Sequence, residues 1–212
     1  MVDAWLSDVR SSYDTDAPGY AEQVRGLLEE NPYLRTSLAL FADLVRDGGG
    51  GPVADIGCGP GYVTGYLHEA GVDVFGVDLS SEMIALARSD YPGLNFEVGT
   101  MTDLQLADGS VAGIVSFWSI VHVPDDAMPG VCAQFRRVLR PSAPLLIGFH
   151  VGDETRHRTE GYSGLTINLD SHRRRPSEVA SWLRDAGFSI EAEVVMRPDE
   201  EVPGAILIAR RA

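Results

Sequence analysis

The sequence predicts an α/β protein, with a parallel sheet covered by helices on both faces. Short apolar, strand-like runs alternate with helical patterns from residue 52 to residue 150, which is typical of such sheets. A glycine-rich turn directly follows the first of these runs, and an acid closes the second. The 212 residues, of which 44% are hydrophobic, suffice for a single domain of this class with a modest additional element.

A helical N-terminal cap or lid is predicted for residues 1–47, ahead of the core at 48–212. Apolar residues recur at helical spacing over 21–30 and 34–46. Asn31-Pro32 separates these two segments, because proline cannot continue a helix. Four consecutive glycines then end the second helix and lead into the first strand.

The core is predicted to continue the strand and helix alternation and to end in a hairpin. Strands are expected at 52–57, 72–78, 94–99, 111–118 and 143–150, and helices at 61–70, 81–90 and 127–139. Residues 151–174 are polar and break the rhythm, so we expect an irregular insert on the substrate side there. A helix beginning at Pro176 comes next, and the charged turn at 197–201 suits a hairpin between strands at 188–196 and 202–210.

The glycine-rich turn Gly57-Cys58-Gly59-Pro60-Gly61 is the most informative segment. Glycine lets a backbone bend sharply and lets a ligand lie against it without a Cβ in the way. The helix that follows offers unpaired N–H groups and a positive dipole end, which favour an anionic group. Asp78 ends the next strand, about 20 residues further on, where an acid is well placed to hold two ribose hydroxyls.

These motifs resemble those of class I S-adenosylmethionine-dependent methyltransferases, especially small bacterial enzymes that modify metabolites. The likeness is carried by Asp55-Ile56-Gly57-Cys58-Gly59-Pro60-Gly61, Val77-Asp78-Leu79-Ser80, Phe96-Glu97-Val98-Gly99, Gly113-Ile114-Val115-Ser116, Val138-Leu139-Arg140-Pro141 and Ala186-Gly187-Phe188. The resemblance implies a Rossmann-like, seven-stranded, mostly parallel sheet with an antiparallel final strand. It also implies S-adenosylmethionine as the cofactor. The hairpin predicted near the C-terminus fits this topology independently.

The resemblance implies a cofactor site along the carboxyl ends of the strands. Gly57, Gly59 and Gly61 would lie under the methionine part, although an ordinary strand-to-helix turn is the alternative for each. Asp55 would act through water or by shaping the loop. Asp78 would accept hydrogen bonds from both ribose hydroxyls, and its alternative role is a helix N-cap.

The adenine contacts are expected to come from apolar side chains. Leu79 and Met83 would flank the ring, unless Met83 is core filler. The family often has Gly-Asp after the third strand, whereas this chain has Gly99-Thr100 followed by Met101. The backbone of Met101 would then contact the adenine, with Asp103 as a substitute acid or a turn residue. Thr100 and Ser119 both fall at strand ends on the same edge.

Tyr13 and Tyr20 lie in a segment that resembles the tyrosine-rich N-terminal segments of the family. Those segments fold over the cofactor and help close the substrate pocket. A solvent-facing helix junction is the alternative interpretation.

Two histidines are candidate catalytic residues, because histidine changes its charge near neutral pH. His122 follows the fourth strand and His150 ends the fifth, both on the expected ligand edge. A hydroxyl acceptor would benefit from such a base, whereas an amine or an acidic phenol needs little more than positioning. The alternative for each is a structural histidine. Trp118, at the end of the fourth strand, could stack on a flat substrate or pack in the core. The three arginines at 173–175 are expected to form a solvated patch.

The predicted function is transfer of a methyl group to an O or N atom of a small molecule by in-line displacement. The net charge of −14 disfavours nucleic acid as substrate. No metal-binding pattern and no apolar run of roughly 18 residues is present. Two cysteines far apart in the sequence and the lack of a signal pattern favour the cytoplasm as the location of the protein. Whether the protein forms a homodimer stays open.

Two other functions stay open at this point. A nicotinamide-dependent oxidoreductase of Rossmann type shares the strand, the turn and the ribose acid, although its fingerprint spaces the glycines differently. A non-catalytic S-adenosylmethionine-binding module is excluded by no feature of the sequence.

Overall fold

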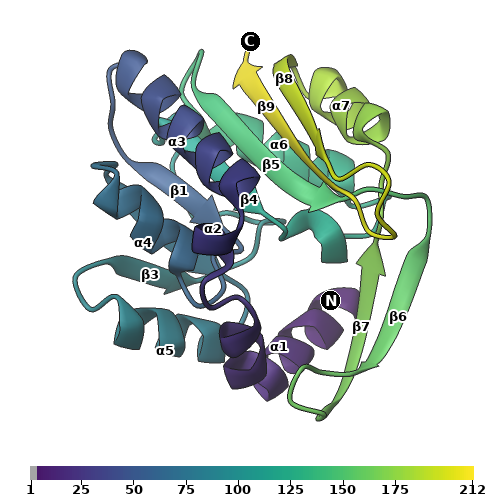
Figure 1. Cartoon of the computed structure of the whole chain (residues 1–212). Helices are drawn as coiled ribbons and strands as arrows, with labels where there is room; N and C mark the ends of the chain where they lie inside the picture. Colours follow the sequence, from purple (N-terminus) through teal and green to yellow (C-terminus); the bar gives the residue numbers. More distant parts are fainter. Residues whose placement is uncertain (1–3) are drawn as a thin grey trace.

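A seven-stranded sheet runs through the centre of the protein, in a computed structural model that describes residues 4–212 (Figure 1). The strand order is β3-β2-β1-β4-β5-β9-β8. The strands are β1 (Val53–Ile56), β2 (Val74–Asp78), β3 (Asn95–Val98), β4 (Gly113–Phe117), β5 (Pro144–His150), β8 (Phe188–Met196) and β9 (Gly204–Arg211). The chain order reverses between β1 and β4, and open α/β sheets bind ligands at such a switch point.

Strands β1 to β5 pair in parallel, and β9 inserts antiparallel between β5 and β8. The register of β1 aligns Ile56 with Val77 of β2, so the glycine turn after β1 starts beside the end of β2. The predicted fold class is confirmed, including the antiparallel final strand and the hairpin that forms it.

Helices cover both faces of the sheet. On one face α3 (Pro32–Asp47) and α4 (Tyr62–Glu69) bury apolar side chains, and on the other face α6 (Met128–Val138) and α7 (Pro176–Asp185) do so. A separate small cluster joins α5 (Ser81–Asp90) to Phe96 of β3. Helix starts follow ordinary capping chemistry: the side chain of Asn31 accepts a hydrogen bond from the backbone N–H of Leu34 at 3.4 Å, with Pro32 in the first turn.

The N-terminal helix begins far earlier than the segment 21–30 that the sequence indicated. Helix α1 spans Ala4–Gln23, with a non-helical kink at Asp16, and only the short α2 (Leu27–Glu30) follows before α3. Helix α1 lies within the helical cap predicted for residues 1–47, but the apolar spacing over 21–30 did not locate it, because apart from Trp5 its apolar residues do not pack against the main core. They face the edge of the sheet and the segment after β5, contacts that no local pattern announces.

Residues 151–174 are not irregular, which corrects the second expectation about local structure. They form an antiparallel hairpin of β6 (Thr155–Glu160) and β7 (Thr166–His172). Every side chain of β6 is at least partly exposed, and only Ile167 and Leu169 of β7 are buried, so the strand signal is weak. The hairpin stands beside α1, at the lower right of Figure 1, and this contact supplies the apolar surface that it lacks by itself.

Candidate functional site

The glycine turn after β1 adopts backbone angles that favour glycine. Gly57, Gly59 and Gly61 have φ of 78°, 54° and 87°. A Cβ on Gly57 would lie closer than 3.0 Å to Ser119, whose hydroxyl donates a hydrogen bond to the Ile56 carbonyl at 2.8 Å. The loop after β4 therefore holds the turn from one side, and a side chain at position 57 would push the two apart.

Asp78 holds the same turn from the other side. Its carboxylate accepts hydrogen bonds from the backbone N–H of Gly59 at 2.8 Å and of Ser80 at 2.9 Å. Ser80, not Asp78, caps α5, because its hydroxyl accepts a hydrogen bond from the N–H of Met83 at 3.1 Å. A carboxylate can accept about four hydrogen bonds, so Asp78 keeps capacity for two hydroxyls of a ligand.

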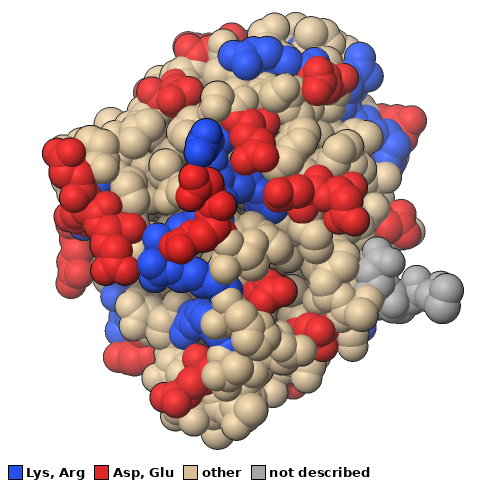
Figure 2. Space-filling model, turned by 90° about the vertical axis from the view of Figure 1, so that its right-hand side faces the viewer, with Lys and Arg blue, Asp and Glu red and all other residues tan. Residues whose placement is uncertain are grey.

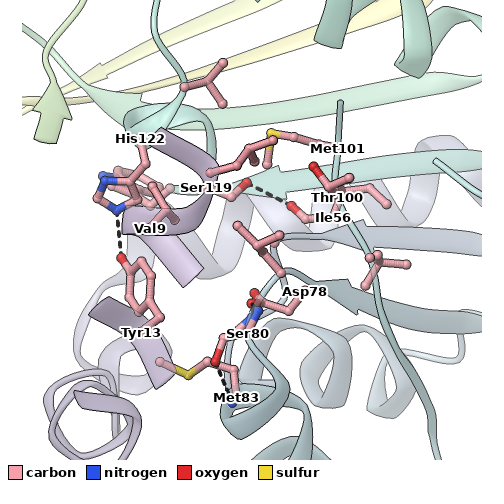
Figure 3. A pocket seen from close by; sticks show the side chains of 18 of the residues that line it. Val9, Tyr13, Ile56, Asp78, Ser80, Met83, Thr100, Met101, Ser119 and His122 are labelled. Atoms are coloured by element: carbon pink, nitrogen blue, oxygen red, sulfur yellow. Dashed lines mark hydrogen bonds between the residues drawn. The ribbon is translucent and has the colours of Figure 1, made fainter. Parts of the chain in front are cut away.

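A cavity, here called the edge cleft, opens along the carboxyl ends of β1, β2 and β4 (Figure 3). It brings together most residues predicted for the cofactor, namely Tyr13, Tyr20, Gly57, Gly59, Asp78, Leu79, Met83, Thr100, Met101 and Ser119, together with His122. Figure 3 shows Tyr13 pointing from α1 toward His122, with Asp78, Thr100 and Met101 on the opposite side. A single elongated ligand in the cleft would touch all of these groups.

Two residues predicted for the cofactor do not line the edge cleft. Asp55 is buried behind the turn, where it accepts a hydrogen bond from the Thr64 hydroxyl at 2.6 Å and its Oδ1 has no partner. Burial raises the pKa of Asp55 to about 7. Gly61 lies against Phe96 and Ala87, so its lack of a Cβ serves the packing of α4 and α5. Both therefore shape the turn from behind.

The segment after β3 contributes Thr100 and Met101 to the edge cleft. The Thr100 and Thr102 hydroxyls lie 2.8 Å apart, and Thr100 pairs with Asp103 in an isolated β-bridge. Asp103 does not line the cleft. Met101, Leu79 and Met83, which the sequence assigned to the adenine, line the edge cleft, whereas the candidate acid Asp103 does not.

A second cavity, here called the side chamber, adjoins the edge cleft. Tyr13, Tyr20, Trp118 and His122 line both cavities and form the wall that the two share. The rest of its wall comes mainly from α2 and α3, from Tyr62 of α4 and His150 of β5, from the β6–β7 hairpin and from the loop between β8 and β9. The chamber contains about 1180 Å³ of empty space, its open mouth included. Two ligands in the two cavities would meet at this shared wall.

His122 is held in the shared wall by two hydrogen bonds. Its Nδ1 lies 2.7 Å from the carbonyl oxygen of Asp170 and therefore carries the proton, because a carbonyl can only accept. Its Nε2 then accepts a hydrogen bond from the Tyr13 hydroxyl at 2.7 Å. Burial lowers the pKa of His122 to about 4, so the imidazole is neutral at pH 7 and retains a proton-accepting nitrogen.

His150 is arranged differently from His122. Its Nδ1 accepts a hydrogen bond from the indole N–H of Trp118 at 3.2 Å, which leaves the proton on Nε2. Trp118 has a φ of 54°, which is rare for a residue with a side chain, and Gly148 and Gly204 leave room for its ring. In this arrangement His150 orients Trp118 and offers no free lone pair for a base.

Helix α1 is fastened over the cavities by side chains that the sequence did not single out. The Ser12 hydroxyl donates to the Asn168 carbonyl at 2.9 Å and accepts from the N–H of Asn168 at 3.1 Å. Asp16, at the kink, accepts hydrogen bonds from the turn of the β6–β7 hairpin, from the N–H groups of Tyr162 and Ser163 and from the Ser163 hydroxyl. Burial alone would raise the pKa of Asp16, but these hydrogen bonds lower it.

Sequence reasoning also missed the part of α1 that lines the edge cleft. Trp5, Leu6 and Val9 form its wall together with Tyr13. Trp5, Val9 and Tyr13 recur every four residues, which places them on one face of a helix. That spacing, within the helical cap predicted for residues 1–47, was the available signal.

The arginine run 173–175 is only partly the solvated patch that the sequence suggested. Arg174 has a side-chain exposure of 1%, and its guanidinium donates to the carboxylate of Asp125 at 2.8 Å and to the Ile120 carbonyl at 2.9 Å. Only Arg175 is well exposed, at 68%. Arg174 thus fixes the loop that carries His122, because a buried guanidinium must have partners.

The buried histidines predict a specific dependence of stability on pH. The pKa of His150 is lowered to about 4 by burial and by Arg173, so the unfolded chain takes up this proton first on acidification. The contribution of neutral His150 to the stability of the folded protein is therefore complete above about pH 6.5 and is lost as the pH falls toward 4. Asp55, whose pKa is raised, acts in the opposite direction, so only a difference between variants isolates His150.

Between pH 7 and pH 5 the free energy of unfolding of the wild type should fall by about 1 kcal/mol more than that of His150→Gln. This value allows for the partial exposure of His150. Urea unfolding at both pH values measures this change. His68→Gln, on an exposed position of α4, is the control. An equal pH dependence in the wild type and His150→Gln would contradict the assignment of a neutral, buried imidazole.

Known methyltransferases are similar to this chain in sequence. Residues 53–142 match the family model described as a methyltransferase domain. In Mycolicibacterium smegmatis, a protein named "Probable S-adenosylmethionine-dependent methyltransferase" is 29% identical over 79% of this chain and 63% of its own length. The chain spans less than two thirds of the length of the curated relatives it matches first.

Two solved structures cover nearly the whole chain. The magnesium protoporphyrin IX methyltransferase of Synechocystis PCC 6803, solved with S-adenosylmethionine, has a TM-score of 0.72 at 19% identity and covers 100% of this chain and 99% of its own. The 1,6-didemethyltoxoflavin-N1-methyltransferase of Burkholderia thailandensis has a TM-score of 0.68 at 23% identity and covers 98% and 87%. At these identities the likeness concerns the fold.

The chain therefore carries a methyltransferase domain. The family match and the sheet topology confirm the predicted class, that of the class I S-adenosylmethionine-dependent methyltransferases. Across residues 4–212, no helix is both long and apolar enough to span a membrane. The same residues contain no cluster of three or more histidine, cysteine or acidic side chains that could hold a metal ion.

Proposed function

We propose that this chain transfers a methyl group from S-adenosylmethionine to an O or N atom of a small molecule. The observation that carries the proposal is the wall shared by two cavities, formed by Tyr13, Tyr20, Trp118 and His122. A donor in the edge cleft and an acceptor in the side chamber would meet directly where these four side chains border both cavities. In-line displacement requires this kind of alignment of two bound reactants.

The residues of the edge cleft fit the proposed cofactor. Its sugar hydroxyls would donate to Asp78, and its amino-acid part would lie on the turn at Gly57 and Gly59, both of which line the cleft. Its adenine would lie among Leu79, Met83 and Met101. When bound, the cofactor supplies an electrophilic methyl group on a positively charged sulfur. The protein aligns the acceptor with it and excludes water.

For a hydroxyl acceptor, Tyr13 and His122 provide a proton path. The acceptor O–H donates its proton to the Tyr13 oxygen, while the Tyr13 proton passes to Nε2 of His122 over the 2.7 Å hydrogen bond. Burial raises the pKa of Tyr13 well above its ordinary value, so we propose that both protons move together rather than through a free tyrosinate. The Asp170 carbonyl accepts a hydrogen bond from the imidazolium that forms.

Three further expectations from the sequence remain proposals. The acidic surface charge supports a small-molecule acceptor rather than nucleic acid. Two buried free cysteines, Cys58 and Cys132, support the cytoplasm as the location. Formation of a homodimer can be tested by sedimentation.

Isothermal titration calorimetry with S-adenosylhomocysteine, the demethylated product, tests the proposed function. We expect stoichiometric binding to the wild type and at least about a hundredfold loss in Asp78→Asn, because two hydroxyls lose a charged acceptor. Asp73→Asn, at an exposed position before β2, is the matched control. If neither the product nor S-adenosylmethionine gives binding heat, or if NADH binds instead, the proposal fails.

A further inference from the structure

The side chamber has a chemical character that distinguishes it from the surface around it. Five aromatic side chains line it: Tyr13, Tyr20, Tyr62, Trp118 and Tyr162. His122 and His150 add two imidazoles, and each is neutral at pH 7 because burial lowers its pKa to about 4. Aromatic walls select flat, aromatic ligands, since rings gain from stacked and edge-to-face contacts.

Three charged side chains line the side chamber. Arg197 and Glu200 pair with each other at 3.7 Å and are more than half exposed, so together they contribute no net charge. Arg158 is the third, and it lies partly buried on β6. The three charged side chains of the lining therefore sum to about +1, in a protein whose net charge is −14.

Arg158 is held in a defined orientation but forms no ion pair with any of residues 4–212; the Asp16 carboxylate lies near enough for the charge of Arg158 to help lower the pKa of Asp16. Its guanidinium lies over the ring of Tyr162, 4.4 Å from the ring centre, and it donates one long hydrogen bond of 3.4 Å to the Glu160 carbonyl. Within residues 4–212, no carboxylate oxygen lies within ion-pair distance of it, whereas its neighbour Arg156 pairs with Glu154 and Glu201. Arginine presents five N–H donors, so most of those of Arg158 are available to a ligand.

The surroundings of Arg158 also place it near the proposed reaction. Tyr162 contacts Tyr20 with ring centres 5.9 Å apart, and Tyr20 contacts Tyr13 at 5.4 Å. Tyr13 in turn holds His122. A continuous aromatic surface thus leads from Arg158 to the shared wall. Figure 2 faces the side of the molecule with the hairpin and shows arginines grouped at its middle among acidic side chains.

We propose that the methyl acceptor is a flat aromatic compound bearing a carboxylate, and that Arg158 binds this carboxylate in the side chamber. A single guanidinium matches the single charge and the planar geometry of a carboxylate, and it pairs with one through two parallel hydrogen bonds. A phosphate monoester carries close to two charges and would leave one of them without a partner. The inference rests on the proposed methyltransferase function and adds the class of acceptor.

Binding of paired probes to the protein saturated with S-adenosylhomocysteine tests this inference. The probes are hydroxy- and amino-substituted benzoates, naphthoates and indole carboxylates, and each acid is compared with its uncharged carboxamide. Phenyl phosphate is a further probe. Affinities are measured by calorimetry. We expect at least one acid to bind at least about tenfold more tightly than its carboxamide, because a hydrogen bond to a charged partner is worth that much.

Two variants assign the preference to Arg158. Arg158→Gln should weaken binding of the preferred acid by about tenfold to a hundredfold and leave its carboxamide unchanged. Arg156→Gln removes the same charge from the same strand outside the chamber and should leave both unchanged. The inference is overturned by equal binding of acid and carboxamide, by tighter binding of phenyl phosphate, by a preference that survives in Arg158→Gln, or by acids that all fail to bind.

The outcome of this experiment is separate from that of the proposed function. Failure of S-adenosylhomocysteine to bind would remove the methyltransferase proposal and this inference together. Normal binding of S-adenosylhomocysteine without any preference for acids would remove only the assignment of the acceptor.

Discussion

Replacing Gly57 by alanine is expected to abolish measurable cofactor binding and to destabilise the protein. The residue has a φ of 78°, and an added Cβ would lie closer than 3.0 Å to the Cβ and Oγ of Ser119. Alanine in this backbone region costs about 1–2 kcal/mol, and the overlap adds roughly 1–3 kcal/mol. The turn can relieve the overlap only by moving, which displaces the surface on which the ligand would lie.

Two further variants separate the causes of this effect. Gly71 has a φ of 82° and nothing within 4 Å of an added Cβ, so Gly71→Ala measures the backbone cost alone. Adding Ser119→Gly to Gly57→Ala removes the overlapping side chain and should restore part of the stability. Thermal unfolding and calorimetry with S-adenosylhomocysteine give the two readouts. Wild-type binding by Gly57→Ala would contradict the role of this turn.

Replacing His122 by glutamine is expected to lower kcat by about a hundredfold to ten-thousandfold on a hydroxyl acceptor, because the variant loses the group that takes up the proton. Binding of S-adenosylhomocysteine should stay within about threefold, since the hydrogen bonds of the Asp78 carboxylate do not involve His122. Steady-state kinetics over a range of pH provides the measurement. His172→Gln, in the β6–β7 hairpin and bonded to Thr155, is the matched control.

The pH profile distinguishes a base from a merely structural residue. Without a base, the rate should rise with pH as the acceptor hydroxyl ionises by itself, so the deficit of His122→Gln should shrink at high pH. A structural role would lower the rate by a similar factor at every pH. An unchanged kcat would exclude proton transfer to His122 and indicate an acceptor that needs only positioning.

The strands of the central sheet were predictable because their signals are local. Strands β1, β2 and β5 are buried almost throughout, and each is bounded by turn residues. The glycine turn and Asp78 follow from the same local pattern, since they stand at fixed positions relative to strand ends. The predicted cofactor residues therefore lie together in the edge cleft, except for Asp55 and Gly61, which support the turn from behind.

Helix α1 and the β6–β7 hairpin were not predictable in the same way, because each depends on the other. Ser12 and Asp16 of α1 bond to Asn168, Tyr162 and Ser163 of the hairpin, more than 140 residues away in the chain. The hairpin has too little buried apolar surface for a clear strand pattern, and the apolar spacing in α1 does not show what that helix packs against. The Tyr13 to His122 hydrogen bond and the aromatic wall beside Arg158 arise only when these two segments meet.

The sequence by itself determined the sheet, the turn at Gly57 and the acid at Asp78, because backbone angles and strand ends are set by neighbouring residues. Only the tertiary structure decided which nitrogen of His122 is free, that His150 orients Trp118, and that Arg158 faces a chamber without a partner carboxylate. Hydrogen-bond partners and burial come from residues distant in the chain, and they determine the protonation and charge of a site.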